Sequence, residues 1–85
     1  MRVLIAEDDA PSRLLLCAAV ERLGHECVEA GDGDEALARF QETVPEVVIT
    51  DLEMPGLDGA ALVRRIRSAP DVAYAYVMVL TAQSD

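Results

Sequence analysis

Hydrophobic and polar positions divide the chain into short apolar runs and longer periodic segments. Residues 3–6, 47–50 and 76–80 are almost wholly apolar, and each run has the length of a β-strand buried on both faces. Residues 26–29, which carry Cys27 and Val28 between two glutamates, predict a shorter strand. We therefore expect four strands, separated by three segments with helical periodicity.

The first helix is expected to follow Pro11, because proline suits a first helical position with Asp9 or Ala10 as the cap. It should end at Gly24. Its predicted buried stripe comprises Leu14, Leu15, Ala18, Ala19 and Leu23.

The other two helices have recognisable start signals. Asp32 followed by Glu35 has the spacing of a capping box and predicts a helix that runs to about residue 42. Asp58 or Gly59 can cap the third helix, which should stop near residues 68–70. Its apolar side comprises Leu62, Val63 and Ile66.

The alternation of strands and helices predicts an α/β fold, a doubly wound parallel sheet of about four strands and three helices (β-α-β-α-β-α-β). In the flavodoxin-like strand order, residues 3–6 and 47–50 form the central strands, which agrees with their apolar composition. Residues 76–80 would then form an edge strand, although such edges are usually short or charged. We therefore expect residues 1–85 to be a partial domain, or one that completes its sheet with another chain.

Composition and charge narrow the possible functions. At 85 residues the chain allows one domain with a thin stability margin, and its net charge of −9 disfavours nucleic acid and anionic membranes as partners. Cys17 and Cys27 lack CxxC spacing and are interpreted as buried free thiols. Neither a signal peptide nor a span of about 20 apolar residues is found, so a cytoplasmic location is expected.

Acidic residues follow both predicted central strands. Glu7 and Asp8 come directly after residues 3–6, and Asp51 directly follows residues 47–50. Ligand sites in such sheets lie beyond the carboxyl ends of the strands, so these acids should converge there. Crowded carboxylates require a proton or a cation, and oxygen ligands suit Mg²⁺. The alternative is that these acids are simply solvated or cap helices.

Three separated motifs give the sequence a family resemblance. They are residues 3–9 (Val-Leu-Ile-Ala-Glu-Asp-Asp) followed by Pro11 and Arg13, residues 48–59 with the pattern Asp-x-x-Met-Pro-x-x-Asp-Gly, and residues 79–82 (Val-Leu-Thr-Ala). Together they closely resemble the response-regulator receiver family of two-component signalling, over the whole chain.

The resemblance implies a role for each matching residue. Asp51 would be the phosphoacceptor, Asp8 would bind Mg²⁺, and Glu7 would act on the ion through water. Glu53 stands where the family uses a backbone carbonyl as a metal ligand, and Thr81 matches the hydroxyl that binds the phosphoryl group and couples it to a conformational switch. The chain would take its phosphoryl group from a histidine kinase or phosphotransfer protein. It would not be an enzyme beyond self-phosphorylation and autodephosphorylation.

The sequence departs from the family at two positions. The family's lysine on the loop after its fifth strand, and the switch residue on that strand, have no counterpart here. One alternative is therefore a pseudo-receiver that acts as an interaction module and forms homo-oligomers through the edge strand of residues 76–80. A metal-dependent phosphohydrolase with an aspartyl phosphate intermediate is the enzyme alternative, but no second acid for the leaving group and no basic clamp are evident.

Overall fold

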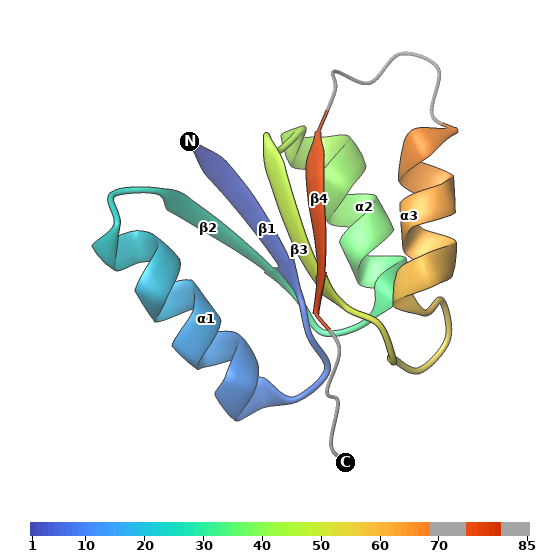
Figure 1. Cartoon of the computed structure of the whole chain (residues 1–85), viewed down its shortest axis with the longest axis horizontal. Coiled ribbons are helices and arrows are strands. Elements are labelled where there is room, and N and C mark those ends of the chain that lie inside the picture. The colour runs from blue at the N-terminus through green and yellow to red at the C-terminus, as the bar shows by residue number, and fades with distance from the viewer. Residues whose placement is uncertain (69–74, 81–85) are drawn as a thin grey trace.

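The computed structural model describes residues 1–68 and 75–80 and has the predicted order of elements (Figure 1). The elements are β1 (Arg2–Ala6), α1 (Ala10–Arg22), β2 (Glu26–Ala30), α2 (Gly33–Thr43), β3 (Val47–Asp51), α3 (Gly59–Arg67) and β4 (Tyr76–Leu80). Thr81 lies outside the described residues.

The four strands form one parallel sheet in the order β2-β1-β3-β4. Helix α1 covers one face, and α2 and α3 cover the other (Figure 1). The predicted doubly wound, flavodoxin-like architecture is therefore confirmed. The register pairs Ala6 of β1 with Ala30 of β2 and Thr50 of β3, so these three strands end at the same edge.

Two apolar layers pack against the sheet. On the α2 and α3 side, Leu4 of β1 packs with Phe40 and Leu62, and all three side chains are fully buried. On the α1 side, Ile5 packs with Cys17 and Val20. Because alternate residues of β1 point into opposite layers, this central strand is buried on both faces, as its all-apolar sequence predicted.

The predicted buried stripe of α1 is wrong. Leu14, Leu15 and Leu23 are 61%, 74% and 76% exposed, and Ala18 and Ala19 are also exposed. The face turned to the sheet carries Arg13, Leu16, Cys17 and Val20, which follow the i, i+3, i+4, i+7 spacing of one helix side. Residues 14–20 are all apolar, so periodicity alone could not decide which side faces inward.

Each helix begins at an aspartate. Asp9, Asp32 and Asp58 are the N-caps, and each carboxylate accepts a hydrogen bond from the backbone amide three residues later. The predicted capping box of α2 forms only in part. Asp32 accepts from Glu35 N, but the Glu35 carboxylate accepts from Gly31 N at 2.7 Å instead of closing back on Asp32.

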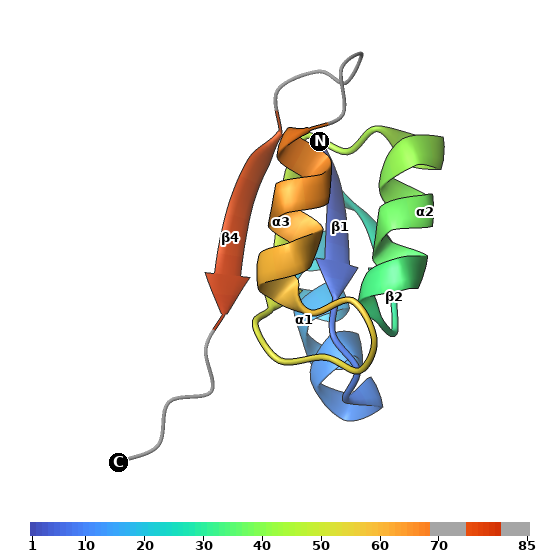
Figure 2. The same ribbon diagram turned by 90° about the vertical axis from the view of Figure 1, so that its right-hand side faces the viewer.

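Strand β4 lies at the outer margin of the described sheet, where it pairs with β3 (Figure 2). Its side chains are largely exposed, with Tyr76 at 66% and Met78 at 45%. The expectation of an apolar strand at a sheet edge therefore holds for the part of the chain that the structure describes.

Candidate functional site

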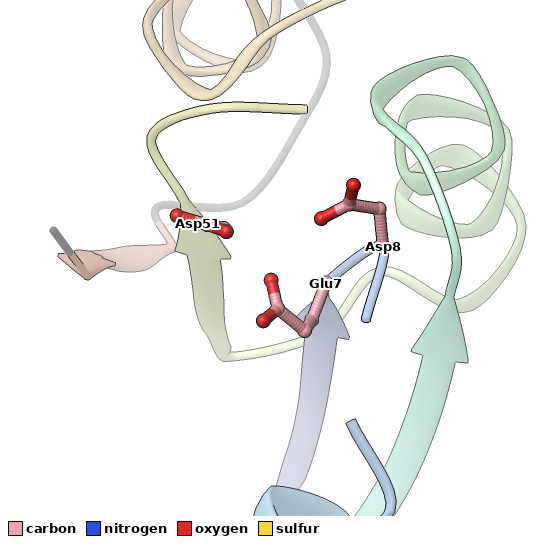
Figure 3. Close-up of side chains that lie close together, drawn as sticks. All are labelled: Glu7, Asp8 and Asp51. Atoms are coloured by element: carbon pink, nitrogen blue, oxygen red, sulfur yellow. The ribbon is translucent and has the colours of Figure 1, made fainter. Parts of the chain in front are cut away.

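The carboxyl ends of β1 and β3 bring three acids together. Ala6 of β1 pairs with Thr50 of β3, so the residues that follow them, Glu7 and Asp51, lie next to each other at the carboxyl ends of the two strands. With Asp8 they form a group in which one carboxylate oxygen from each residue lies within 4.8 Å of those of the other two (Figure 3). Figure 3 shows the three side chains converging from the two strand ends. The predicted convergence is confirmed for these three residues.

The segment that joins β1 to α1 is held at both ends. Glu7 N donates to the carbonyl of Ala30 at 3.0 Å, which ties the end of β1 to β2. Two residues later, Asp9 accepts from Ser12 N at 3.0 Å, and hydrogen bonds from Ser12 lower the pKa of this carboxyl. Asp9 is therefore committed to capping α1, which leaves Glu7 and Asp8 as the acids of this segment that face Asp51.

Close backbone contacts hold the loop after Asp51. Leu52 N donates to the carbonyl of Leu80 at 3.0 Å, and Gly59 N donates to the carbonyl of Leu52 at 2.9 Å. A side chain at Gly59 would collide with the Asp51 carbonyl, because a Cβ there would lie 2.3 Å from that oxygen. The start of α3 therefore packs directly on the residue that carries the site's carboxylate.

A second glycine contact joins the same loop to α2. A Cβ on Gly33 would lie 1.7 Å from the carbonyl oxygen of Leu57. Gly56, within the loop, has a φ of 73°, a left-handed conformation that glycine adopts without steric cost. The loop that follows Asp51 is thus fixed against both α2 and α3.

The three acids place unfavourable charge at the site. Burial is the main factor that raises the pKa of Glu7 to about 7, followed by a hydrogen bond with Asp51 and by the charges of Asp51, Asp8 and Asp9. The buried Oε2 atom of Glu7 has no hydrogen-bond donor among the described residues. A proton shared with Asp51, or a cation, would relieve this arrangement.

The arrangement fits a magnesium ion. Mg²⁺ takes six oxygen ligands at about 2.1 Å and usually keeps several waters, so opposite ligands lie about 4 Å apart. One carboxylate oxygen from each acid lies within 4.8 Å of the others, so the three could share an ion after small side-chain movements or through a bridging water. Oε2 of Glu7, which has no donor among the described residues, is free to accept from such a water. Asp8 and Asp51 are the candidates for direct ligands, with Glu7 close enough to hold a metal-bound water.

The structure gives a different position to each of the other predicted site residues. The Glu53 side chain is exposed and is not part of the three-acid group, while Glu53 N donates to Asp51 Oδ1 at 3.4 Å. Its predicted role through the backbone carbonyl stays a prediction. Thr81, as noted, lies outside the described residues, so its predicted hydroxyl contact also stays a prediction.

Sequence reasoning missed one contact of this region. Arg13 Nη1 donates to the carbonyl of Glu7 at 2.8 Å, and Arg13 Nε pairs with Glu29 at 3.3 Å. In the sequence, Arg13 stands out only as part of a motif. Its spacing puts it on one helix side with Cys17 and Val20, but residues 14–20 are apolar on every side, so the sequence gives no signal that this side faces the sheet.

A family model described as the response regulator receiver domain matches residues 3–85. The chain belongs to this receiver family. A probable chemotaxis protein CheY from Rhizobium etli is 37% identical over all of this chain and 67% of its own length. A gliding motility regulatory protein from Myxococcus xanthus is 40% identical over 96% of this chain and 11% of its own length. The chain thus spans only a small part of some relatives.

Solved receiver structures share the fold. The response regulator TrrA from Thermotoga maritima, solved in complex with Mg²⁺-BeF, superposes with a TM-score of 0.88 at 35% identity, covering 98% of this chain and 70% of TrrA. The predicted family is therefore confirmed, and with it a place in the phosphorelay signalling of two-component systems.

Family membership also gives the general behaviour of the domain. Receiver domains are signalling phosphoacceptors rather than enzymes, they bind Mg²⁺ at an acidic pocket, and they interact with histidine kinases or phosphotransfer proteins. A virulence sensor protein, BvgS from Bordetella bronchiseptica, matches 81% of the chain at 45% identity. No helix in the described part of this receiver is long and apolar enough to cross a membrane.

Proposed function

We propose that Asp51 accepts a phosphoryl group from a histidine kinase or phosphotransfer protein in a reaction that requires Mg²⁺. The observation that carries the proposal is the convergence of Glu7, Asp8 and Asp51 at the ends of β1 and β3, with one carboxylate oxygen from each within 4.8 Å of the others (Figure 3). Bound Mg²⁺ would neutralise charge on the transferring phosphoryl oxygens.

Asp51 is the best placed of the three acids to act as the nucleophile. It ends β3, its Oδ1 atom is oriented by Glu53 N, and its backbone is held by the start of α3. A carboxylate oxygen of Asp51 would attack the phosphorus of a phosphohistidine, and the bond from phosphorus to the imidazole nitrogen would break. With a proton on its other ring nitrogen, the imidazole leaves as a neutral base, and the product is an acyl phosphate on Asp51.

Turnover of the acyl phosphate is the finer part of the proposal. Water would attack the phosphorus and release inorganic phosphate, which returns the Asp51 carboxylate. The exposed Glu53 side chain stands two residues away and would influence the access of that water. Thr81 is the candidate for coupling the phosphoryl group to a conformational switch, on its sequence resemblance alone. Residues 1–85 contain no lysine, so they supply no lysine ammonium group to bind the phosphoryl oxygens.

The test is phosphorylation by acetyl phosphate, followed by intact mass. Wild type should gain the mass of one phosphoryl group in the presence of Mg²⁺ and none in EDTA. Asp51→Asn should gain nothing under either condition, while Asp34→Asn, a matched change of an exposed aspartate, should behave as wild type. Phosphorylation of Asp51→Asn to the wild-type extent would contradict the assignment of Asp51.

A second proposal concerns association. The exposed side chains of β4 and its place at the edge of the described sheet support pairing with β4 of a second copy (Figure 2). The net charge of −9 opposes such contact, so dimerisation should strengthen with salt. Sedimentation velocity at two salt concentrations tests this, and a monomer in both would contradict it.

We also propose that the domain acts in the cytoplasm, where histidine kinases present their phosphoryl groups.

A further inference from the structure

The side chain of Arg13 connects three elements beside the acidic site. It leaves α1, its Nη1 atom donates to the carbonyl of Glu7 at the end of β1, and its Nε atom pairs with Glu29 of β2. The two distances are 2.8 and 3.3 Å, and the Arg13 side chain is only 22% exposed. Lower exposure and contacts with two other elements of the fold distinguish this arginine from Arg39, which is 45% exposed and, among the described residues, pairs only with glutamates of its own helix.

The Arg13 contact completes the hydrogen bonding of the Glu7 backbone. Glu7 N already donates to the carbonyl of Ala30 at 3.0 Å, so the carbonyl is the one polar backbone group of Glu7 that β2 does not engage. That carbonyl belongs to the peptide that links Glu7 to Asp8. A donor held against it fixes the plane of this peptide, and therefore the direction in which the Asp8 side chain leaves the backbone.

Asp8 is fixed from its other side as well. Asp9, the next residue, is held by its capping bond to Ser12 N at 3.0 Å. Asp8 is therefore a single residue between two anchored neighbours. Its carboxylate is directed at Asp51 by backbone geometry, since it has no side-chain hydrogen bond within residues 1–68 and 75–80 (Figure 3).

We infer that Arg13 is a positioning residue for the acidic site: it fixes the Glu7–Asp8 peptide so that the Asp8 carboxylate meets Mg²⁺ in the productive direction. Glu29 orients the guanidinium and offsets its charge, so the arginine stands beside the acids without repelling the cation strongly. The inference rests on the proposed Mg²⁺ site. It assigns to Arg13 neither contact with the ion nor contact with the phosphoryl group.

The sign of the change in Mg²⁺ affinity separates this role from a simple charge effect. Removal of a positive charge near three carboxylates would, by itself, strengthen cation binding. Loss of the peptide's orientation would weaken it, and removal of residues that orient metal ligands typically reduces affinity by about 10- to 100-fold. If the role of Arg13 were purely structural, its removal would lower the stability of the fold and leave the Mg²⁺ affinity of the folded protein unchanged.

The experiment is a MgCl₂ titration followed by the NMR shifts of the Asp8 and Asp51 amides, on wild type, Arg13→Met, Arg13→Lys and Arg39→Met. Methionine keeps the apolar stem of the side chain but removes its charge and its donors. Lysine keeps the charge but cannot reproduce the planar fork that serves Glu7 and Glu29 together. Arg39→Met is the matched control, because Arg39 pairs only with exposed glutamates on α2 among the described residues.

We expect Arg13→Met to bind Mg²⁺ about tenfold more weakly than wild type. Arg13→Lys should lie between the two, and Arg39→Met should bind as tightly as wild type or slightly more tightly. Equal or tighter binding by a folded Arg13→Met would overturn the inference and leave the proposed function standing. If Arg13→Met does not fold, Arg13→Lys decides alone, since its charge is unchanged and wild-type affinity would refute the positioning role. A wild type that shows no Mg²⁺-dependent shifts at these amides would overturn the proposed function together with the inference.

Discussion

Replacement of Gly33 by alanine tests how closely the loop after Asp51 is packed. Gly33 is the first residue of α2, where alanine would normally be favoured over glycine by up to about 1 kcal/mol. The structure predicts instead that Gly33→Ala lowers the free energy of unfolding. An added Cβ would lie 1.7 Å from the carbonyl oxygen of Leu57, although real Cβ contacts essentially never fall below 3.0 Å, so the loop and the helix must separate by at least 1.3 Å.

The cost follows from the kind of atom that must move. The obstacle is the backbone carbonyl of Leu57, which cannot rotate away as the end of a flexible side chain would. Overpacking of this kind costs about 1–3 kcal/mol, and we expect the upper end, about 3 kcal/mol. A domain of this size has a free energy of unfolding of roughly 4–13 kcal/mol, so the loss should be large relative to the total.

The assay is urea unfolding followed by circular dichroism, with Gly31→Ala as the matched control. A Cβ on Gly31 would meet Arg13 Nη1 at 3.5 Å and Glu35 Oε1 at 3.6 Å, which are ordinary van der Waals distances. With an m-value of about 1 kcal/mol/M, Gly33→Ala should lower the midpoint by about 3 M, and Gly31→Ala by less than about 1 M. A Gly33→Ala protein as stable as wild type would refute the close packing of α2 against this loop.

Three further predictions concern the acids, the thiols and a helix cap. The pKa of Glu7 is about 7 in the folded protein against 4.5 in the unfolded chain, so the free energy of unfolding without metal should fall as pH rises from 4.5 to 7. In urea unfolding in EDTA, Glu7→Gln should therefore add about 1 kcal/mol at pH 8 but little at pH 4.5. An equal gain at both pH values would contradict the assigned pKa. Cys17 is buried as expected, whereas Cys27 is only partly buried. Burial raises the pKa of both thiols, so at pH 8 a thiol reagent should label the folded protein at least about tenfold more slowly than the urea-unfolded chain, and equal rates would count against the shielding of the two thiols. Asp58→Ala should cost about 1 kcal/mol by removing the cap of α3, whereas Asp58→Asn should remain near wild type, and equal losses in both would exclude a capping role.

The sequence predicted the parts of the fold that depend on composition and order. The flavodoxin-like strand order placed β1 and β3 at the centre of the sheet, in agreement with their apolar sequences, and the acids at their ends, Glu7 and Asp51, were predicted to meet and do meet. Parallel strands share a carboxyl edge, so the convergence needs no knowledge of side-chain geometry.

The rotation of α1 could not be predicted in the same way. Residues 14–20 are apolar on every side of the helix, so their pattern does not distinguish one face from another. Contacts with residues distant in sequence decide the rotation: the Arg13 side chain binds the carbonyl of Glu7 and pairs with Glu29 of β2. For the same reason, sequence reasoning did not find the role of Arg13 beside the site.

The central claim is that Asp51 carries the phosphoryl group, and reductive trapping of the acyl phosphate tests it most directly. After incubation with acetyl phosphate and Mg²⁺, borohydride reduces an aspartyl phosphate to an alcohol that peptide mass spectrometry locates at a single residue. The account predicts the alcohol at Asp51 with Mg²⁺ and its absence in EDTA. An alcohol at Asp8 or Glu7 instead, or equal reduction at Asp51 with and without Mg²⁺, would contradict it.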